Sequence, residues 1–292
     1  MSDTVTRFLF EALDIRGAFV RLETSWQAMQ EGRSYPPAVR NLLGELTATS
    51  VIISSQLKQA GRLTLQLIGH GPVNLLLVDV DHELRMRGMA RAEGEITNTD
   101  VPSLLGDGRL VITMQPDNLP QPYQSVVPME GESIANIFEL FLEQSEQQSS
   151  ALWLAADEQS CAGLFIQKLP AADRKDADGW ARIHHLASTV QSSELLSLDT
   201  EILLRRLFHE EIEAGGIRIY EPRSVAWHCP QDWDKVRNML RSLGREELES
   251  ILAEHGEVMI HDDICNHVYR FNAQDIDALF DDGNLPPTTP AS

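Results

Sequence analysis

The sequence predicts an α+β fold made of a large N-terminal domain of mixed sheet and helix, a helical connector and a small C-terminal domain resembling a zinc switch. Strand-length apolar segments surround one long helical pattern in the first half, helical patterns alone follow, and two cysteine-bearing loops bracket the last part. The 292 residues suffice for one large and one smaller domain. We expect boundaries at 1–171, 172–222 and 223–280, with a disordered proline-containing tail at 281–292.

The N-terminal domain is expected to be built on a buried helix that begins at Pro36 and ends near Gln59. Two consecutive prolines suit a first helical turn, and apolar residues on several helix faces indicate burial. A membrane or partner helix is the alternative, and Glu45 and Lys58 oppose it. Alternating or continuous apolar patterns predict strands at residues 15–20, 63–67, 73–80, 84–91, 110–114, 123–129, 152–155 and 162–169.

The connector is predicted to be helical at Trp180–Thr189 and Asp199–Glu211. The second pattern places apolar residues on one side, namely Ile202, Leu203, Leu207 and Phe208. Because an amphipathic helix must bury its apolar face, we expect the connector to lie on a sheet of the N-terminal domain.

The small domain is predicted to hold two short helices between two loops. Asp232 can cap the first helix, which ends at Gly244, and the second runs from Arg245 to Glu254. The expected inward residues are Val236, Met239, Leu240, Leu243, Leu248, Ile251 and Leu252.

The two loops carry soft ligands that suit zinc. Thiolate and imidazole are the usual ligands of structural zinc, whereas Gln231, two positions after the first cysteine, is a poor one. The candidate ligands are Cys229, Cys265 and Asp262, with His228, His261 or His267 as the fourth. The alternative is a former metal site held by packing alone, in which aromatic residues replace the metal: Trp227, Trp233 and Tyr269.

Composition and motifs exclude several classes of function. A formal net charge of −20 opposes nucleic acid or an anionic membrane as a partner. No G-x-S-x-G or Walker A pattern occurs, and His209-Glu210-Glu211 lacks the second histidine of H-E-x-x-H, so we expect no enzyme. Cys161 is expected to be an inert buried thiol. Three cysteines, no signal-peptide pattern and no membrane-length apolar run predict a cytoplasmic protein.

Short segments along nearly the whole chain match the sequence pattern of a known protein family. The most specific is Phe141-Leu142-Glu143-Gln144-Ser145-Glu146-Gln147, and others are Gly69 to Leu75, Met86-Arg87-Gly88, Tyr220-Glu221-Pro222 and Tyr269 to Ala273. In these pieces and in their order the sequence resembles the 33 kDa heat-shock chaperone family (heat shock protein 33), a family of bacterial redox-regulated holdases. The resemblance implies an ATP-independent chaperone that binds unfolding proteins, a connector that covers the client-binding surface and detaches on activation, and a homodimer when active.

The resemblance is incomplete at the cysteines. The family carries C-x-C and C-x2-C, whereas here Cys229 and Cys265 match one member of each pair, and Gln231 and Asp262 occupy the other two places. The family's oxidation joins close neighbours, so the resemblance leaves Cys229 with Cys265 as the redox pair. That bond would close a loop of about 36 residues and stabilise the small domain by roughly 4 kcal/mol. Oxidation would then tighten the domain, and heat or another unfolding stress would activate the protein.

Two other classes of function stay open at this point. One is a thiol- or metal-dependent oxidoreductase that uses Cys229 and Cys265, although the C-x-x-C motif that would support it does not occur. The other is a zinc-module interaction protein that binds nucleic acid, which the net charge of −20 opposes.

Overall fold

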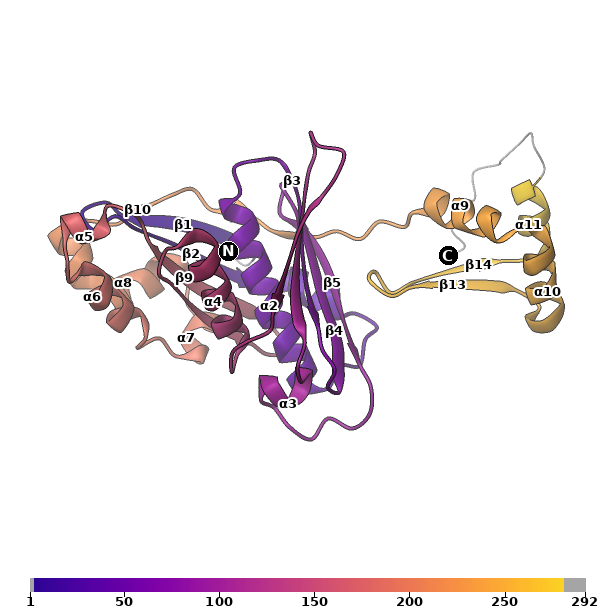
Figure 1. Ribbon diagram of the computed structural model, residues 1–292, viewed down its shortest axis with the longest axis horizontal. Coiled ribbons are helices and arrows are strands. Elements are labelled where there is room, and N and C mark those ends of the chain that lie inside the picture. Colours follow the sequence, from indigo (N-terminus) through magenta and orange to yellow (C-terminus); the bar gives the residue numbers. More distant parts are fainter. Residues whose placement is uncertain (1–2, 281–292) are drawn as a thin grey trace. The chain divides into compact units, whose positions relative to one another are not determined.

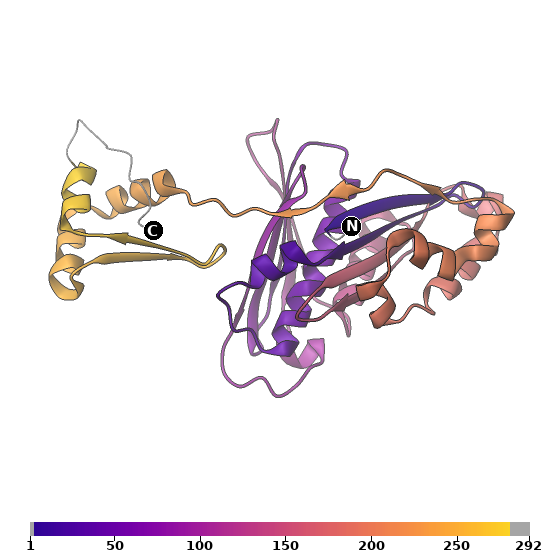
Figure 2. The same ribbon diagram turned by 180° about the vertical axis from the view of Figure 1, so that it is seen from behind.

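The computed structural model describes residues 3–280 and divides the chain into two compact units, Met1–His228 and Cys229–Ser292 (Figures 1 and 2). The boundary lies after the expected one at residue 222, because residues 223–227 pair with strands of the first unit. The expected disordered tail at 281–292 lies outside the described residues.

The first unit has two six-stranded sheets with the helix α2 (Pro37–Gln56) between them (Figure 1). The first sheet has the order β10-β1-β2-β9-β8, with β11 also paired to β1, and the second has the order β12-β5-β4-β3-β6-β7. The first sheet's strands are β1 (Thr4–Phe10), β2 (Ile15–Leu22), β8 (Ser150–Ala156), β9 (Cys161–Lys168), β10 (Arg218–Ile219) and β11 (Arg223–Ser224). The second sheet's strands are β3 (Gly61–Ile68), β4 (Val73–Asp81), β5 (Arg85–Ala92), β6 (Arg109–Pro116), β7 (Tyr123–Pro128) and β12 (Ala226–Trp227). Three further helices complete the core: α1 (Thr24–Gln30), α3 (Val101–Leu105) and α4 (Ile134–Glu146).

The central helix is buried on several sides, as the sequence predicts. Leu43, Leu46 and Ile52 are fully buried. The hydroxyls of Thr47 and Ser50 donate to the carbonyl oxygens of Leu43 and Leu46 at 2.7 Å, so these buried polar groups are satisfied within the helix. Within residues 3–280, no helix is both long and apolar enough to cross a membrane.

The connector forms four helices on the face of the first sheet that points away from α2 (Figures 1 and 2). They are α5 (Ala172–Lys175), α6 (Gly179–Ala187), α7 (Ser192–Ser197) and α8 (Thr200–Ala214). The expected packing on a sheet is confirmed, but one predicted contact is wrong. Ile202 is 56% exposed, and Leu204 is buried in its place beside Leu203. The buried stripe of α8 is Leu203, Leu204, Leu207 and Phe208, which recur at helical spacing, and Ile202 lies one position outside it.

Up to residue 280, the second unit contains three helices and a β-hairpin. Its elements are α9 (Trp233–Leu243), α10 (Arg245–His255), β13 (Val258–Asp262), β14 (His267–Phe271) and α11 (Ala273–Phe280). Asp232 caps α9 by accepting from the backbone N–H of Lys235 at 2.9 Å, as expected. Met239 and Leu243 are 41% and 51% exposed, so their predicted inward position is wrong: the unit is small and its core reaches only one edge of the helix.

Candidate functional site

An apolar face of the first sheet lies beneath the connector. We call it the covered face, and its sheet residues are Phe8, Phe10, Ile15, Phe19, Ala151, Ala155, Ala162, Leu164 and Ile166. Strand alternation explains the set, because neighbours such as Ala18, Val20 and Phe165 point to the other side and pack with α2 in a separate cluster. The covered face therefore owes its burial to the connector and not to the central core.

The connector contributes its own apolar side chains to this interface. Phe208 is fully buried, and its ring meets the ring of Phe10 edge-on at 5.0 Å between centroids. The other buried connector residues here are Ile183, Ala187, Leu195, Leu203, Leu204 and Leu207. Sequence reasoning missed β1 and with it Phe8 and Phe10, although the alternation of Thr6, Phe8 and Phe10 is a strand signal.

Polar contacts between connector and core are fewer and more exposed. Arg21 donates to the carbonyl oxygen of Ser197 at 2.7 Å, and its guanidinium lies 3.5 Å from the carboxylate of Asp199. Lys175 donates to the carbonyl oxygen of Glu11 at 2.7 Å. Exposed contacts of this kind contribute little to stability, so the apolar interface dominates the attachment of the connector.

After the connector, the chain runs through three strands of two residues each. β10 and β11 pair with β1, and β12 pairs in parallel with β5. Each pairing is short and lies at a sheet edge, so each is individually easy to open. Trp227 belongs to β12 and packs against the core of the first unit, so its expected place in the small domain is wrong.

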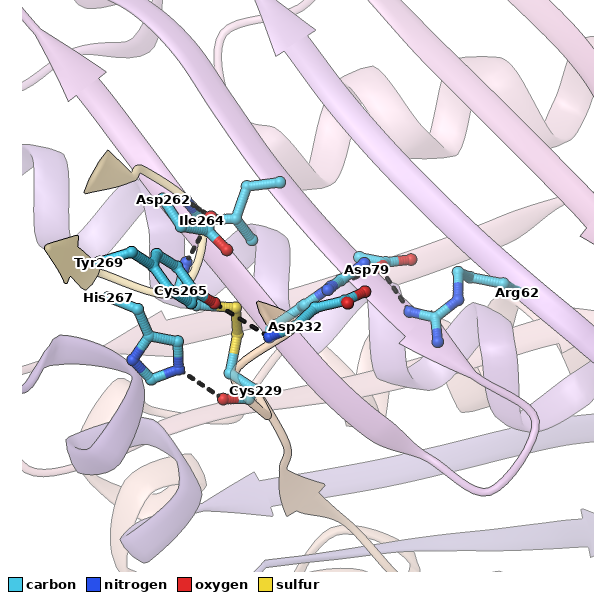
Figure 3. Close-up of a disulfide and its surroundings, with 10 residues drawn as sticks. Arg62, Asp79, Cys229, Asp232, Asp262, Ile264, Cys265, His267 and Tyr269 are labelled. Carbon is cyan, nitrogen blue, oxygen red and sulfur yellow. Dashed lines mark hydrogen bonds and ion pairs between the residues drawn. A yellow bond between two sulfur atoms is a disulfide. The ribbon is translucent and has the colours of Figure 1, made fainter. Parts of the chain in front are cut away.

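The second unit contains a disulfide between Cys229 and Cys265, with a Cα–Cα distance of 5.6 Å (Figure 3). Cys229 precedes α9, and Cys265 lies in the four-residue turn that joins β13 to β14. The sequence missed this hairpin and expected a plain loop. Asp262 shapes the turn, because its carboxylate accepts from the backbone N–H groups of Ile264 and Cys265 at 3.0 and 3.3 Å.

Two hydrogen bonds reinforce the disulfide (Figure 3). The Nε2 atom of His267 donates to the carbonyl oxygen of Cys229 at 2.7 Å, and the backbone N–H of Asp232 donates to the hydroxyl of Tyr269 at 3.0 Å. The ring of Trp233 meets that of Tyr269 edge-on at 4.8 Å. The segment before α9 is thus attached to the β13–β14 hairpin at three neighbouring points, through Cys265 in the turn and through His267 and Tyr269 on β14. The expected aromatic packing holds for Trp233 and Tyr269.

The other candidate zinc ligands are engaged elsewhere. His261 contacts Asp263 and Asn266 through its two ring nitrogens, at 2.9 and 3.1 Å. His228 belongs to the first unit, where its backbone N–H donates to Met86. Among residues 3–280 there is no group of three His, Cys, Asp or Glu side chains that could hold a metal ion. A disulfide also supplies no thiolate, so the disulfide-bonded arrangement does not fit zinc. Zinc binding by the reduced chain stays a prediction.

The third cysteine lies apart from this pair. Cys161 begins β9 and is fully buried in the core of the first unit. Burial raises the pKa of its thiol well above the ordinary value, which keeps it in the unreactive protonated form. The prediction of an inert thiol agrees with this environment.

Comparisons with known proteins cover nearly the whole chain. The family model described as Hsp33 protein matches residues 3–272. The 33 kDa chaperonin of Methylobacillus flagellatus is 40% identical over 282 residues, which are 96% of this chain and 95% of that protein. The 33 kDa chaperonin of Nitrosococcus oceani is 38% identical over 287 residues, 98% and 97% of the two chains. The crystal structure of the 33 kDa chaperonin of Thermotoga maritima matches with a TM-score of 0.81 at 21% identity, covering 96% of this chain and 98% of that one, and thus shares the fold.

A two-sheet core with a covering connector and a small cysteine-bearing unit, matched along almost its entire length by 33 kDa chaperonins, defines a chaperone. The chain belongs to the Hsp33 family. The expected α+β fold and the family resemblance are both confirmed.

Proposed function

We propose that this protein is an ATP-independent holdase, which binds unfolding proteins and prevents their aggregation. The observation that carries the proposal is the covered face. Its aromatic and aliphatic side chains are buried only because a separate amphipathic segment lies on them. Movement of that segment would expose an apolar surface, and such a surface binds the apolar segments that unfolding proteins expose.

Activation is proposed to occur by unfolding of the C-terminal unit followed by release of the connector. The short edge strands β10, β11 and β12 lie in the segment that joins the connector to the C-terminal unit, so this segment couples the two events. Once the C-terminal unit loosens, they lose a folded anchor, and their few ladder hydrogen bonds can open. Heat or another unfolding stress is the proposed trigger.

Further parts of the proposal follow the family. The partners are unfolded client proteins, and a homodimer forms in the active state. The protein is proposed to act in the cytoplasm and to catalyse no reaction. The net charge of −20 supports the absence of nucleic-acid and anionic-membrane partners.

The proposal is tested by placing a charge under the connector. Leu207 is 3% exposed on α8, and Ile202, on the same helix, is 56% exposed. Leu207→Asp should release the connector, because a buried carboxylate without a partner is strongly unfavourable. We expect this variant to suppress the aggregation of a thermally unfolding client, without ATP, at a temperature where the unmodified chain does not.

Ile202→Asp is the matched control and should behave like the unmodified chain. Limited proteolysis of the connector reports its release independently of client binding. A Leu207→Asp variant whose connector is cleaved rapidly while its core stays folded, yet which binds no client, would contradict the holdase function.

A further inference from the structure

The disulfide encloses most of the C-terminal unit. Cys229 and Cys265 lie 36 positions apart in the sequence, and α9, α10 and β13 lie between them. The unit's core is small and consists of Val236, Leu240, Leu248, Val258, Tyr269, Phe271, Ile276 and Leu279. A unit of this size buries too little apolar surface for secure stability, and such units usually need a cross-link or a metal.

Resting on the holdase function proposed above, we propose that this disulfide is a reversible lock. Its formation holds the C-terminal unit folded and the chaperone inactive, and its reduction loosens the unit and favours client binding. The redox response then has the sign opposite to activation by oxidation.

The surroundings of the bond offer Cys229 and Cys265 no other thiol with which to pair. Gln231 accepts a hydrogen bond from the indole N–H of Trp233 at 3.1 Å, and Asp262 is engaged in the hairpin turn. Neither side chain can exchange with the disulfide, because neither is a thiol. Cys161, the third cysteine, is fully buried in the other unit. Within this chain, Cys229 and Cys265 can therefore form a disulfide only with each other.

Reduction leaves the enclosed segment with non-covalent attachments. The hydrogen bonds from His267 to Cys229 and from Asp232 to Tyr269 remain, together with the small apolar core. The chain-entropy estimate for a loop of this length corresponds to a change in the folding equilibrium on the order of 10²- to 10³-fold. When a marginally stable unit loses this stabilisation, its unfolded state is populated far more often.

The chemistry of the lock is a two-electron exchange. Opening requires a reductant of the dithiol class, whose two thiols become a cyclic disulfide while the two cysteine sulfurs take up two electrons and two protons. Closing can use hydrogen peroxide. One cysteine thiol attacks the peroxide to give a sulfenic acid and water, and the second thiol then displaces a second water and forms the S–S bond.

The first test measures the lock without any client. Amide hydrogen exchange of residues 233–280 in the full chain is compared after peroxide and after dithiothreitol treatment. We expect exchange in the reduced state to be faster by about 10²- to 10³-fold, with the central helix α2 unchanged. Cys229→Ser should show the faster exchange with or without dithiothreitol. Cys161→Ala is the matched control and should retain the redox response.

Two results would overturn the lock. One is equal exchange in the reduced and oxidised states. The other is a reduced chain that carries one zinc per molecule and loses it on Cys229→Ser, because the metal would then close the reduced unit as the disulfide closes the oxidised one.

The second test measures suppression of client aggregation. Dithiothreitol-treated protein should act at a lower temperature than peroxide-treated protein, and Cys229→Ser should act at that lower temperature in both treatments. Activation by peroxide at low temperature, abolished by Cys229→Ser, would overturn the proposed sign.

The two tests separate failure of the lock from failure of the function. If exchange responds to reduction but no state binds clients at any temperature, the holdase function fails, and with it the regulatory half of the proposal. If clients are bound but exchange ignores reduction, the lock alone fails.

Discussion

Each of the two units of this protein is stabilised internally in a different way. The first has a long helix buried between two sheets and a second apolar cluster beneath the connector. The second has a few buried side chains and a covalent bond between its entry segment and its hairpin. The first unit buries two large apolar clusters, whereas the second, under the lock proposed above, relies on a cross-link whose existence varies with redox conditions. One chain thus combines a stable first unit with a second unit whose stability depends on conditions. Such an arrangement suits a stress response, because stress can unfold the second unit while the first stays folded.

The largest effect is expected from a charge in the central helix. Ile52 is fully buried in α2, so Ile52→Asp places a carboxylate among apolar neighbours and should cost about 5 kcal/mol or more, which prevents folding of the first unit. Circular dichroism and thermal unfolding measure the result.

Ile202→Asp, at the 56% exposed position on α8, controls for the charge itself and should leave the unfolding transition in place. A soluble, cooperatively folded Ile52→Asp variant of normal stability would contradict the view that the first unit depends on this core.

A smaller but selective effect is expected from a cavity in the apolar core of the C-terminal unit. Leu240 is fully buried in α9, and Leu240→Ala should destabilise the C-terminal unit by about 2–5 kcal/mol. Because the unit is small, this loss should unfold it while the first unit stays folded, and hydrogen exchange resolves the two.

Leu243→Ala, at a 51% exposed position of the same helix, is the matched control and should have little effect. Simultaneous unfolding of both units by Leu240→Ala would contradict their independence.

The first unit should also respond to pH through Glu45. Burial in α2 raises the pKa of this carboxyl to about 7, so the folded state binds a proton more tightly than the unfolded state. The stabilisation is complete below the ordinary pKa of about 4.5 and is lost as pH rises through 7. We expect the free energy of unfolding to fall by up to about 3 kcal/mol across this range.

Denaturant unfolding between pH 4.5 and 8 measures this dependence, and Glu45→Gln should flatten it. Glu201→Gln, an exposed substitution on α8, should leave the slope as it is. An unchanged slope in Glu45→Gln would show that other groups carry the pH dependence.

The sequence was most informative where a local pattern decides the structure. The two prolines at the start of α2, the alternation in β3 and the cap at Asp232 act through neighbouring residues, and all three features appear as expected. It was least informative where a long-range contact decides. Ile202 and Met239 fit a helical apolar stripe, but the surfaces they would meet end before reaching them, and both are exposed.

The cysteine pair shows the same limit. The family resemblance left Cys229 and Cys265 as the redox pair, and the structure places them in one disulfide. The hairpin that presents Cys265 was not foreseen, because short strands such as β13 and β14 carry little periodic signal and depend on their pairing. Nor does sequence reveal that His267 bonds the carbonyl of Cys229, since that contact spans 38 positions.

The smallest effect concerns one hydrogen bond beside the disulfide. Tyr269→Phe keeps the ring that packs against Trp233 but removes the hydroxyl that accepts from the backbone N–H of Asp232. The loss should cost about 1 kcal/mol, because the donor is only partly buried and can turn to water. In the oxidised chain the disulfide still attaches this segment, so the C-terminal unit should stay folded with slightly faster exchange. In the reduced chain the same loss acts on a weakened unit and should raise the unfolded population clearly.

Tyr123→Phe, at a 62% exposed position in the first unit, is the control and should change neither state. If Tyr269→Phe unfolded the oxidised unit completely, the hydrogen bond and not the disulfide would be what holds the unit together.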